Sequence, residues 1–217
     1  MSPELLSLLW DSFIETLVMV GLSGGIATLI GIPLGLLLAV TAPGHILARP
    51  VFNKTLGLVV NAVRSTPFII LMVAIIPFTR LITGTSIGTA AAVVPLAIAA
   101  IPFVGRLVEG ALREVDGGLI EAAQAMGATP MQIITKVLVP ESLPGILNGL
   151  TIMLVSLIGF SAMAGAVGGG GLGDLGIRYG YQRFMPEVMG MVVLVLIVFV
   201  QLVQSCGDWL SRRLNHR

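Results

Sequence analysis

Five long apolar runs constrain the fold of this chain more than any other feature. They occupy about residues 13–40, 56–82, 87–112, 146–166 and 188–210, and a helix of about 20 residues is long enough to cross a bilayer. The apolar residues follow one another without the alternation of a barrel strand. Only 11% of the residues are charged, against about 25% in a typical soluble domain. The sequence therefore predicts an all-α polytopic membrane protein with five transmembrane helices, forming a single transmembrane domain over residues 1–217 in contact with the lipid bilayer.

Charge and reactive residues exclude several classes of function. The net charge is +1, so no basic field indicates nucleic acid. The first eleven residues lack a basic region, and we expect no cleaved signal peptide. His45 and His216 have no ligand cluster around them, and the motifs of zinc proteases and serine hydrolases are absent. We therefore expect no catalytic residue, no metal site and no cofactor in this chain.

A glycine-rich run over residues 165–173 invites comparison with a phosphate-binding loop. Such a loop needs a Gly-Lys-Ser/Thr ending and a preceding strand. The only two lysines, Lys54 and Lys136, lie elsewhere. We interpret the run as a flexible re-entrant turn on the extracytoplasmic side that ends the fourth span.

Basic residues in the connecting segments set the predicted orientation, because Lys and Arg stay on the cytoplasmic side. With five spans, the first and third connections share a side with the C-terminus. That side carries eight basic residues and the opposite side carries three. The eight are Arg49, Lys54, Arg106, Arg113, Lys136, Arg212, Arg213 and Arg217, and the three are Arg80, Arg178 and Arg183. We therefore expect the N-terminus outside and the C-terminus and residues 113–144 in the cytoplasm.

Glycine and proline interrupt three successive spans. The first contains two Gly-xxx-Gly pairs, which let helix backbones approach closely, and the next two contain prolines, which leave carbonyls without helical donors. For any one glycine, tight packing within the bundle is the simpler explanation. Together, the interruptions indicate a bundle that lines a pathway or moves. The residues are Gly21, Gly25, Gly31, Gly35, Pro67, Pro77, Pro95 and Pro102.

Arg64, Ser65 and Thr66 form the clearest polar interruption inside a predicted span. A charged side chain in a transmembrane helix usually faces a cavity or a partner. These residues, with Asn61, are therefore candidates to line a pathway. The alternative is that Arg64 extends to the lipid headgroups, because it is close to the start of its segment.

Between the third and fourth spans, the sequence predicts two short helices. Asp116 or Gly117 begins the first, Glu121 near its first turn suits the helix dipole, and Gly127 follows it as a left-handed C′ residue. Ala122, Ala123 and Ala125 have short side chains, which would let another protein surface come close to this helix. We expect Ala123 and Met126 to expose little apolar area. An amphipathic hairpin on the bilayer surface is the alternative.

The second short helix carries its own start signal. Thr129 at N-cap, Pro130 at N1 and Gln132 at N3 predict a capping box. We expect this helix to run to about Val139 and Pro140 to stop it.

The segment from Glu121 to Pro140 resembles the cytoplasmic signature of ABC-importer permeases. Glu-Ala-Ala, Gly and Pro fall at the family's spacing, with Val137 and Val139 in place of Ile and Leu. The resemblance implies a coupling helix that docks in a groove of a separate ATPase subunit, which would bind ATP and Mg. The residues it assigns to ATPase coupling are Glu121, Ala122, Ala123, Met126, Gly127 and Pro140.

Further stretches look like the methionine-importer permease family, among them residues 64–71, 76–80, 84–88, 125–133, 160–163 and 165–168. This resemblance implies an inner-membrane permease that works as a homodimer with two ATPase subunits and an extracytoplasmic substrate-binding protein. It alone names methionine as the substrate. Permeases for another amino acid or small substrate, and an ATPase-independent channel or secondary transporter, are alternatives.

We place the substrate pathway in the second and fourth spans. Small hydroxyl, thioether and aromatic side chains could pass a zwitterion with an apolar thioether without trapping it. The alternative is that Phe160 and Met163 pack the core of a dimer. The candidates are Ser65, Thr66, Phe160, Ser161 and Met163.

Overall fold

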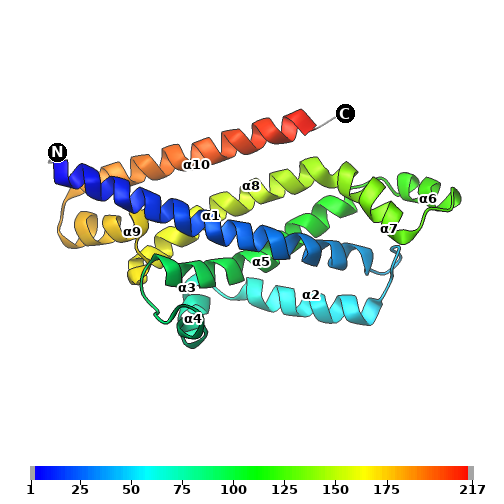
Figure 1. The fold of residues 1–217 in the computed structure, drawn as a ribbon, viewed down its shortest axis with the longest axis horizontal. Helices are drawn as coiled ribbons and strands as arrows, with labels where there is room; N and C mark the ends of the chain where they lie inside the picture. The colour runs from blue at the N-terminus through cyan, green and yellow to red at the C-terminus, as the bar shows by residue number, and fades with distance from the viewer. Residues whose placement is uncertain (1–2, 215–217) are drawn as a thin grey trace.

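The computed structural model describes residues 3–214, and His216 and Arg217 lie outside this range. Within it the chain is helical and contains no strand (Figure 1). Three wider π-helical stretches, η1, η2 and η3, continue neighbouring helices. The elements are α1 Pro3–Val40, α2 Pro50–Ser65, α3 Phe68–Ala74, α4 Ile76–Thr83, α5 Thr89–Arg113, α6 Gly117–Ala125, α7 Pro130–Ile133, η1 Ile134–Leu138, α8 Val139–Ala164, η2 Gly165–Gly169, α9 Gly171–Leu175, η3 Gly176–Gln182 and α10 Pro186–Leu214.

Four helical stretches among the described residues are long and apolar enough to cross a membrane. They are Pro3–Val40, Thr89–Arg113, Pro130–Gly169 and Pro186–Leu214. The fifth predicted span, 56–82, is not one helix, because α2 and α3 meet at 101° and α4 follows as a further helix. The break is at Pro67, which has no amide hydrogen and holds the preceding Thr66 extended at φ −82° and ψ 123°. Five crossings result only if the bent pair counts as one.

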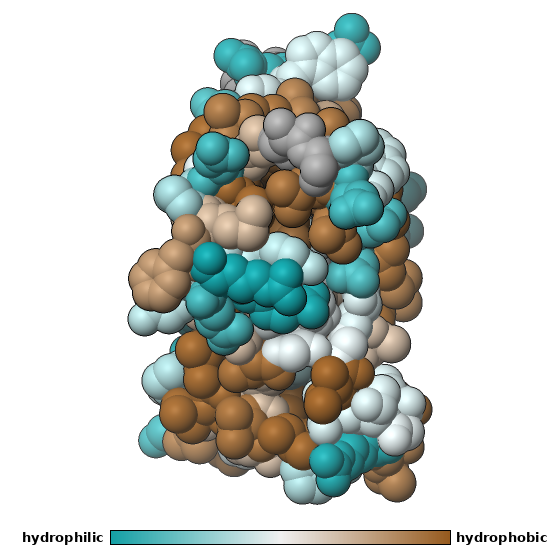
Figure 2. All heavy atoms as spheres, turned by 90° about the vertical axis from the view of Figure 1, so that its left-hand side faces the viewer, coloured by the Kyte–Doolittle hydropathy of each residue, from teal (hydrophilic) through white to brown (hydrophobic). Residues whose placement is uncertain are grey.

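The long helices α1, α5, α8 and α10 run roughly along the long axis of the molecule (Figure 1). The N-terminal end of α1 and the C-terminal end of α10 lie at opposite ends of the molecule, and α6 and α7 share the end of the C-terminus (Figure 1). Viewed from the end that carries the N-terminus, hydrophilic residues are interspersed among hydrophobic ones (Figure 2).

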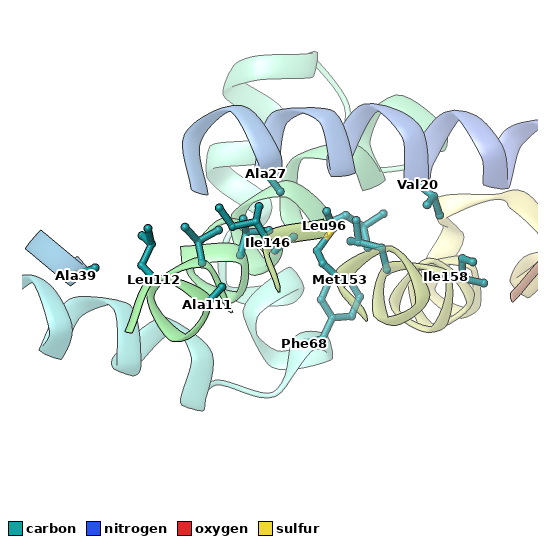
Figure 3. Close-up of a cluster of buried hydrophobic side chains, with 14 of the residues drawn as sticks. Val20, Ala27, Ala39, Phe68, Leu96, Ala111, Leu112, Ile146, Met153 and Ile158 are labelled. Carbon is teal, nitrogen blue, oxygen red and sulfur yellow. The ribbon is translucent and has the colours of Figure 1, made fainter. Parts of the chain in front are cut away.

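The two Gly-xxx-Gly pairs of α1 differ in how closely another helix packs on them. A Cβ atom on Gly31 would lie 2.6 Å from the Cβ of Val104, so this part of α1 lies directly on α5. No atom lies within 4 Å of the Cβ position at Gly21 or Gly25. The core continues from this contact to α3 and α8, and Phe68 extends into it near Leu96 and Met153 (Figure 3).

Pro140 does not stop the second short helix, which corrects our prediction. α7 continues through η1 into α8, so residues 130–164 are helical without interruption. The amide of Val139 donates to the carbonyl of Ile134, five residues back, as in a π turn. A π turn contains one more residue than an α turn. The backbone carbonyls of the preceding turn are therefore shifted away from the positions where they would clash with the pyrrolidine ring of Pro140.

The glycine-rich run contains a tight reversal followed by a helix that the sequence did not predict. Gly168, Gly170 and Gly171 have φ values between 75° and 90°, the left-handed region that favours glycine. α9 then begins, and the Glu15 carboxylate accepts the amide of Gly171 at 2.6 Å. Thr16 accepts the next amide at 2.9 Å. Side chains of α1 therefore cap α9.

Candidate functional site

The connection between α5 and α8 begins with a capped helix, as predicted. Asp116 is the N-cap of α6, and its carboxylate accepts the amide of Gly118 at 2.7 Å. The side chain satisfies one of the amides that have no partner in the first helical turn. Residue Asp116 thus fixes where α6 starts.

Gly127 ends α6 in the left-handed conformation, with φ 78°, which confirms the prediction. Its amide donates to the carbonyl of Gln124 at 2.9 Å, and the amide of Ala128 donates to the carbonyl of Ala123 at 3.0 Å. These two bonds form a Schellman motif. The chain turns sharply there without leaving the last carbonyls of α6 unsatisfied.

The predicted capping box is also present. The Thr129 hydroxyl accepts the amide of Gln132 at 3.4 Å, and the Gln132 side chain accepts the amide of Thr129 at 2.8 Å. Pro130 occupies the first turn. Two local motifs in a row therefore set the angle between α6 and α7.

α6 has two faces. Ala123 is buried in the main core and Ile120 packs against it. Glu121 and Ala122 are exposed, and Met126, three residues after Ala123, is 82% exposed, contrary to our expectation that it exposes little apolar area. The buried alanine holds the helix on the protein, and the methionine at the C-terminal end of the helix remains exposed.

Two further apolar residues near Met126 in the sequence, Leu119 and Met131, are exposed and were not predicted as part of the site. Leu119 is seven residues before Met126, a spacing that places both on one helical face. Met131 follows in α7 and is 68% exposed. The heptad spacing of Leu119 and Met126 was the available signal. An exposed apolar surface of this kind, rimmed by polar groups, is typical of a protein-binding site.

A second candidate site is a cavity of about 230 Å³ between α2, α3, α5 and α8. Two of the predicted pathway residues, Thr66 and Phe160, lie together on its wall. Phe68 and Phe160 are stacked with ring centroids 4.9 Å apart and planes 10° apart. The lining residues are Val63, Arg64, Thr66, Phe68, Leu71, Ala99, Phe103, Ser156 and Phe160.

The other three pathway candidates lie off this wall. The exposed hydroxyl of Ser65 donates to the carbonyl of Asn61 at 2.8 Å. Ser161 is buried and donates to the carbonyl of Ile158 at 2.8 Å. Met163 is 46% exposed and does not line the cavity. Only Thr66 and Phe160 are therefore brought together.

An ion-pair cluster fixes α2 on α5 next to this cavity. Glu109 is buried and lies 2.6 Å from both the Arg106 and Arg113 guanidinium groups. Arg106 also donates to the Gly57 carbonyl at 3.0 Å and to the Asn61 amide oxygen at 2.9 Å. The paired guanidinium thus bridges the two helices.

Between residues 3 and 214 no group of three or more His, Cys, Asp and Glu side chains is placed to hold a metal ion.

The chain is similar to known transport proteins over its whole length. The family described as binding-protein-dependent transport system inner membrane component matches residues 31–217. The chain is 57% identical over 216 residues to the probable D-methionine transport system permease protein MetI of Vibrio cholerae, covering 100% of this chain and 94% of that protein. It is 54% identical over 165 residues to the D-methionine transport system permease protein MetI of Escherichia coli K12, covering 76% of each.

Solved structures give the same result. A chain from an inward-facing MetNI methionine ABC transporter superposes with a TM-score of 0.97 at 51% identity, with 100% of both chains covered. A chain from an amino acid ABC transporter with histidines has a TM-score of 0.78 at 21% identity, covering 98% of this chain and 100% of that one. The second match shows a shared fold.

Proposed function

This chain belongs to the family of binding-protein-dependent transport system inner membrane components, and we propose that it is the permease subunit of an ATP-driven importer of methionine. Family membership makes it a multi-pass transport component of the inner membrane rather than an enzyme. The choice of methionine is supported by relatives at 57% and 54% identity that are named D-methionine permeases.

The observation that carries the coupling role is the pair of exposed apolar side chains at α6. Leu119 and Met126 are exposed at a helix whose end is fixed by Gly127, and the buried Ala123, between them in the sequence, holds the helix on the core. The proposed partner is an ATPase subunit that holds ATP and Mg and accepts this face in a groove. Helix-in-groove recognition uses apolar anchors at this spacing.

The proposed assembly is a homodimer of one membrane domain per chain, with two ATPase subunits and an extracytoplasmic substrate-binding protein. The N-terminus would lie outside, and the C-terminus and α6 inside. This orientation is supported by the basic residues at the proposed inner side and by the position of α6 at the same end as the C-terminus (Figure 1).

The proposed mechanism is alternating access. ATP binding would close the ATPase dimer, displace α6 and α7 and rotate the spans so that the pathway opens outward. Hydrolysis would return it to the inward-facing state. The pathway would include Thr66 and Phe160, with Ser65, Ser161 and Met163 as further candidates that other states of the cycle would have to expose.

Copurification and transport test this proposal. The chain is expressed with its cognate ATPase, purified in mild detergent and reconstituted with the cognate binding protein, and uptake of labelled methionine is measured with and without ATP. We expect a stable complex and uptake that requires ATP. Glu121→Lys and Gly127→Pro should abolish ATP-driven uptake.

Two outcomes contradict the proposal. Transport without an ATPase, retained in both variants, would identify a channel or secondary transporter. Uptake that excess unlabelled methionine does not compete away, while another amino acid does, would replace the proposed substrate.

A further inference from the structure

Arg64 is an unpaired charge at a break in a membrane-crossing segment. It lies in the last turn of α2, just before the 101° bend. Arg106, Arg113 and Arg178 each lie beside a carboxylate, whereas among residues 3–214 Arg64 forms neither an ion pair nor a side-chain hydrogen bond. Charged groups in membrane segments usually pair or mark the path of a substrate. Arg64 is exposed and lines the cavity between α2, α3, α5 and α8, so its charge is available to a ligand there.

The surroundings of Arg64 favour a small anion with an apolar tail. Its guanidinium carbon lies 5.9 Å from the centroid of the Phe103 ring. The stacked rings of Phe68 and Phe160 form the rest of the aromatic wall. No carboxylate lines the cavity, so Arg64 supplies its only full charge within the described residues.

The cavity has the size of one amino acid. Its volume is about 230 Å³, and a water molecule occupies about 30 Å³ in the liquid. The space therefore holds roughly seven or eight groups of that size, which is enough for a single amino acid.

The helix that carries Arg64 is held in place by bonds to α5, although the Arg64 side chain itself makes no hydrogen bond within residues 3–214. Asn61, one helical turn earlier, accepts a hydrogen bond from Arg106 of α5 at 2.9 Å, and Gly57 accepts another at 3.0 Å. These bonds hold α2 against α5 beside the cavity. A charged group whose helix is fixed before its ligand arrives loses less entropy on binding.

We propose that Arg64 receives the α-carboxylate of the amino acid during transit, while Phe68, Phe103 and Phe160 contact its side chain. A guanidinium matches a carboxylate with two parallel hydrogen bonds. The thioether of methionine suits aromatic walls. This inference rests on the proposed function and adds to it the residue that recognises the feature common to all amino acids.

The test uses the complete complex in proteoliposomes with its ATPase and loaded binding protein. Arg64→Gln, Arg64→Lys and the control Arg49→Gln are compared for methionine uptake and for ATP hydrolysis stimulated by the binding protein. Arg49 directly precedes α2 and is exposed, and it does not line the cavity. Uptake and hydrolysis are measured on the same vesicles.

We expect Arg64→Gln to lower uptake at least tenfold, the scale for loss of a charge-assisted hydrogen bond. Stimulated hydrolysis should stay within twofold of the unsubstituted complex, because the ATPase contacts are elsewhere. Arg64→Lys should recover at least a third of the uptake, and Arg49→Gln should be unchanged.

Three results would overturn the inference. A fall in uptake of less than tenfold for Arg64→Gln would show that transport does not depend on a contact with Arg64. A parallel fall of uptake and hydrolysis would show a structural role. Failure of Arg64→Lys to recover any uptake would show that the positive charge is not what the site uses.

Failure of the proposed function gives a different result. If the unsubstituted complex imports another amino acid, methionine is the wrong substrate, and the same variants are assayed with that amino acid. The predicted pattern is unchanged, because the carboxylate is common to both. If the complex imports no amino acid at all, both proposals fail.

Discussion

Gly35 of α1 and Gly105 of α5 lie so close that a Cβ atom on Gly35 would be 2.6 Å from the Gly105 carbonyl oxygen. The obstacle is backbone, which cannot rotate away as a side chain can. The two helices therefore pack through their main chains, as Gly-xxx-Gly sequences allow in membranes. This contact leads to the first prediction.

Gly35→Ala should lower the free energy of unfolding by about 1–3 kcal/mol, the usual cost of overpacking. Thermal unfolding of the purified protein in detergent measures the effect. Gly25→Ala is the matched control on the same helix, since no atom lies within 4 Å of its Cβ position. Equal melting temperatures for the two variants would contradict the proposed close approach.

Glu109→Ala should destabilise the protein more than Arg113→Ala. Glu109 is buried between two guanidinium groups, and its removal leaves Arg106 without a countercharge, which costs about 3–5 kcal/mol for a buried pair. The Arg113 side chain is 51% exposed, and removal of an exposed partner costs about 1 kcal/mol or less. Thermal unfolding of both variants tests the order, which a larger loss for Arg113→Ala would refute.

Met126→Asp should weaken copurification of the ATPase at least fivefold, because a charge replaces an exposed apolar anchor of α6. The measurement is the ratio of the two subunits after affinity purification. Tyr181→Asp is the control, since Tyr181 is also largely exposed and belongs to η3, at the other end of the molecule. Unchanged subunit ratios in Met126→Asp would exclude this face as the docking surface.

Gly127→Ala should reduce the uptake obtained per ATP hydrolysed. Any side chain in the left-handed region costs about 1–2 kcal/mol, and φ is 78° here although no atom obstructs a Cβ. Gly127→Asn should be milder, because asparagine tolerates this conformation. Gly110→Ala is the control, a helical position with equal space around it. The prediction fails if Gly127→Ala matches that control.

Local motifs around Gly127 could be predicted because their partners are close in sequence. The capping box joins Thr129 to Gln132, and the helix stop depends on one glycine. Composition and run length were enough to predict an all-helical membrane protein, and the resemblance supplied the family.

Features that depend on tertiary packing could not be predicted. A proline inside an α-helix usually breaks it, but the π turn before Pro140 lets the helix continue. The exposure of Met126 depends on which face Ala123 buries. The cavity combines four helices, so spacing along one of them could not show that Thr66 faces Phe160 while Ser161 does not.

The uninterrupted helix from Pro130 to Ala164 has a mechanical consequence. At about 1.5 Å per residue its path is roughly 50 Å long, with the capping box at one end and the glycine-rich reversal at the other, and it changes direction between α8 and α7 (Figure 1). Tilting α8 alone, a segment of about 39 Å, by about 5° around its middle would move each of its ends by roughly 2 Å. A displacement of α7 that tilts α8 would therefore move the glycine-rich end of the helix in the opposite direction.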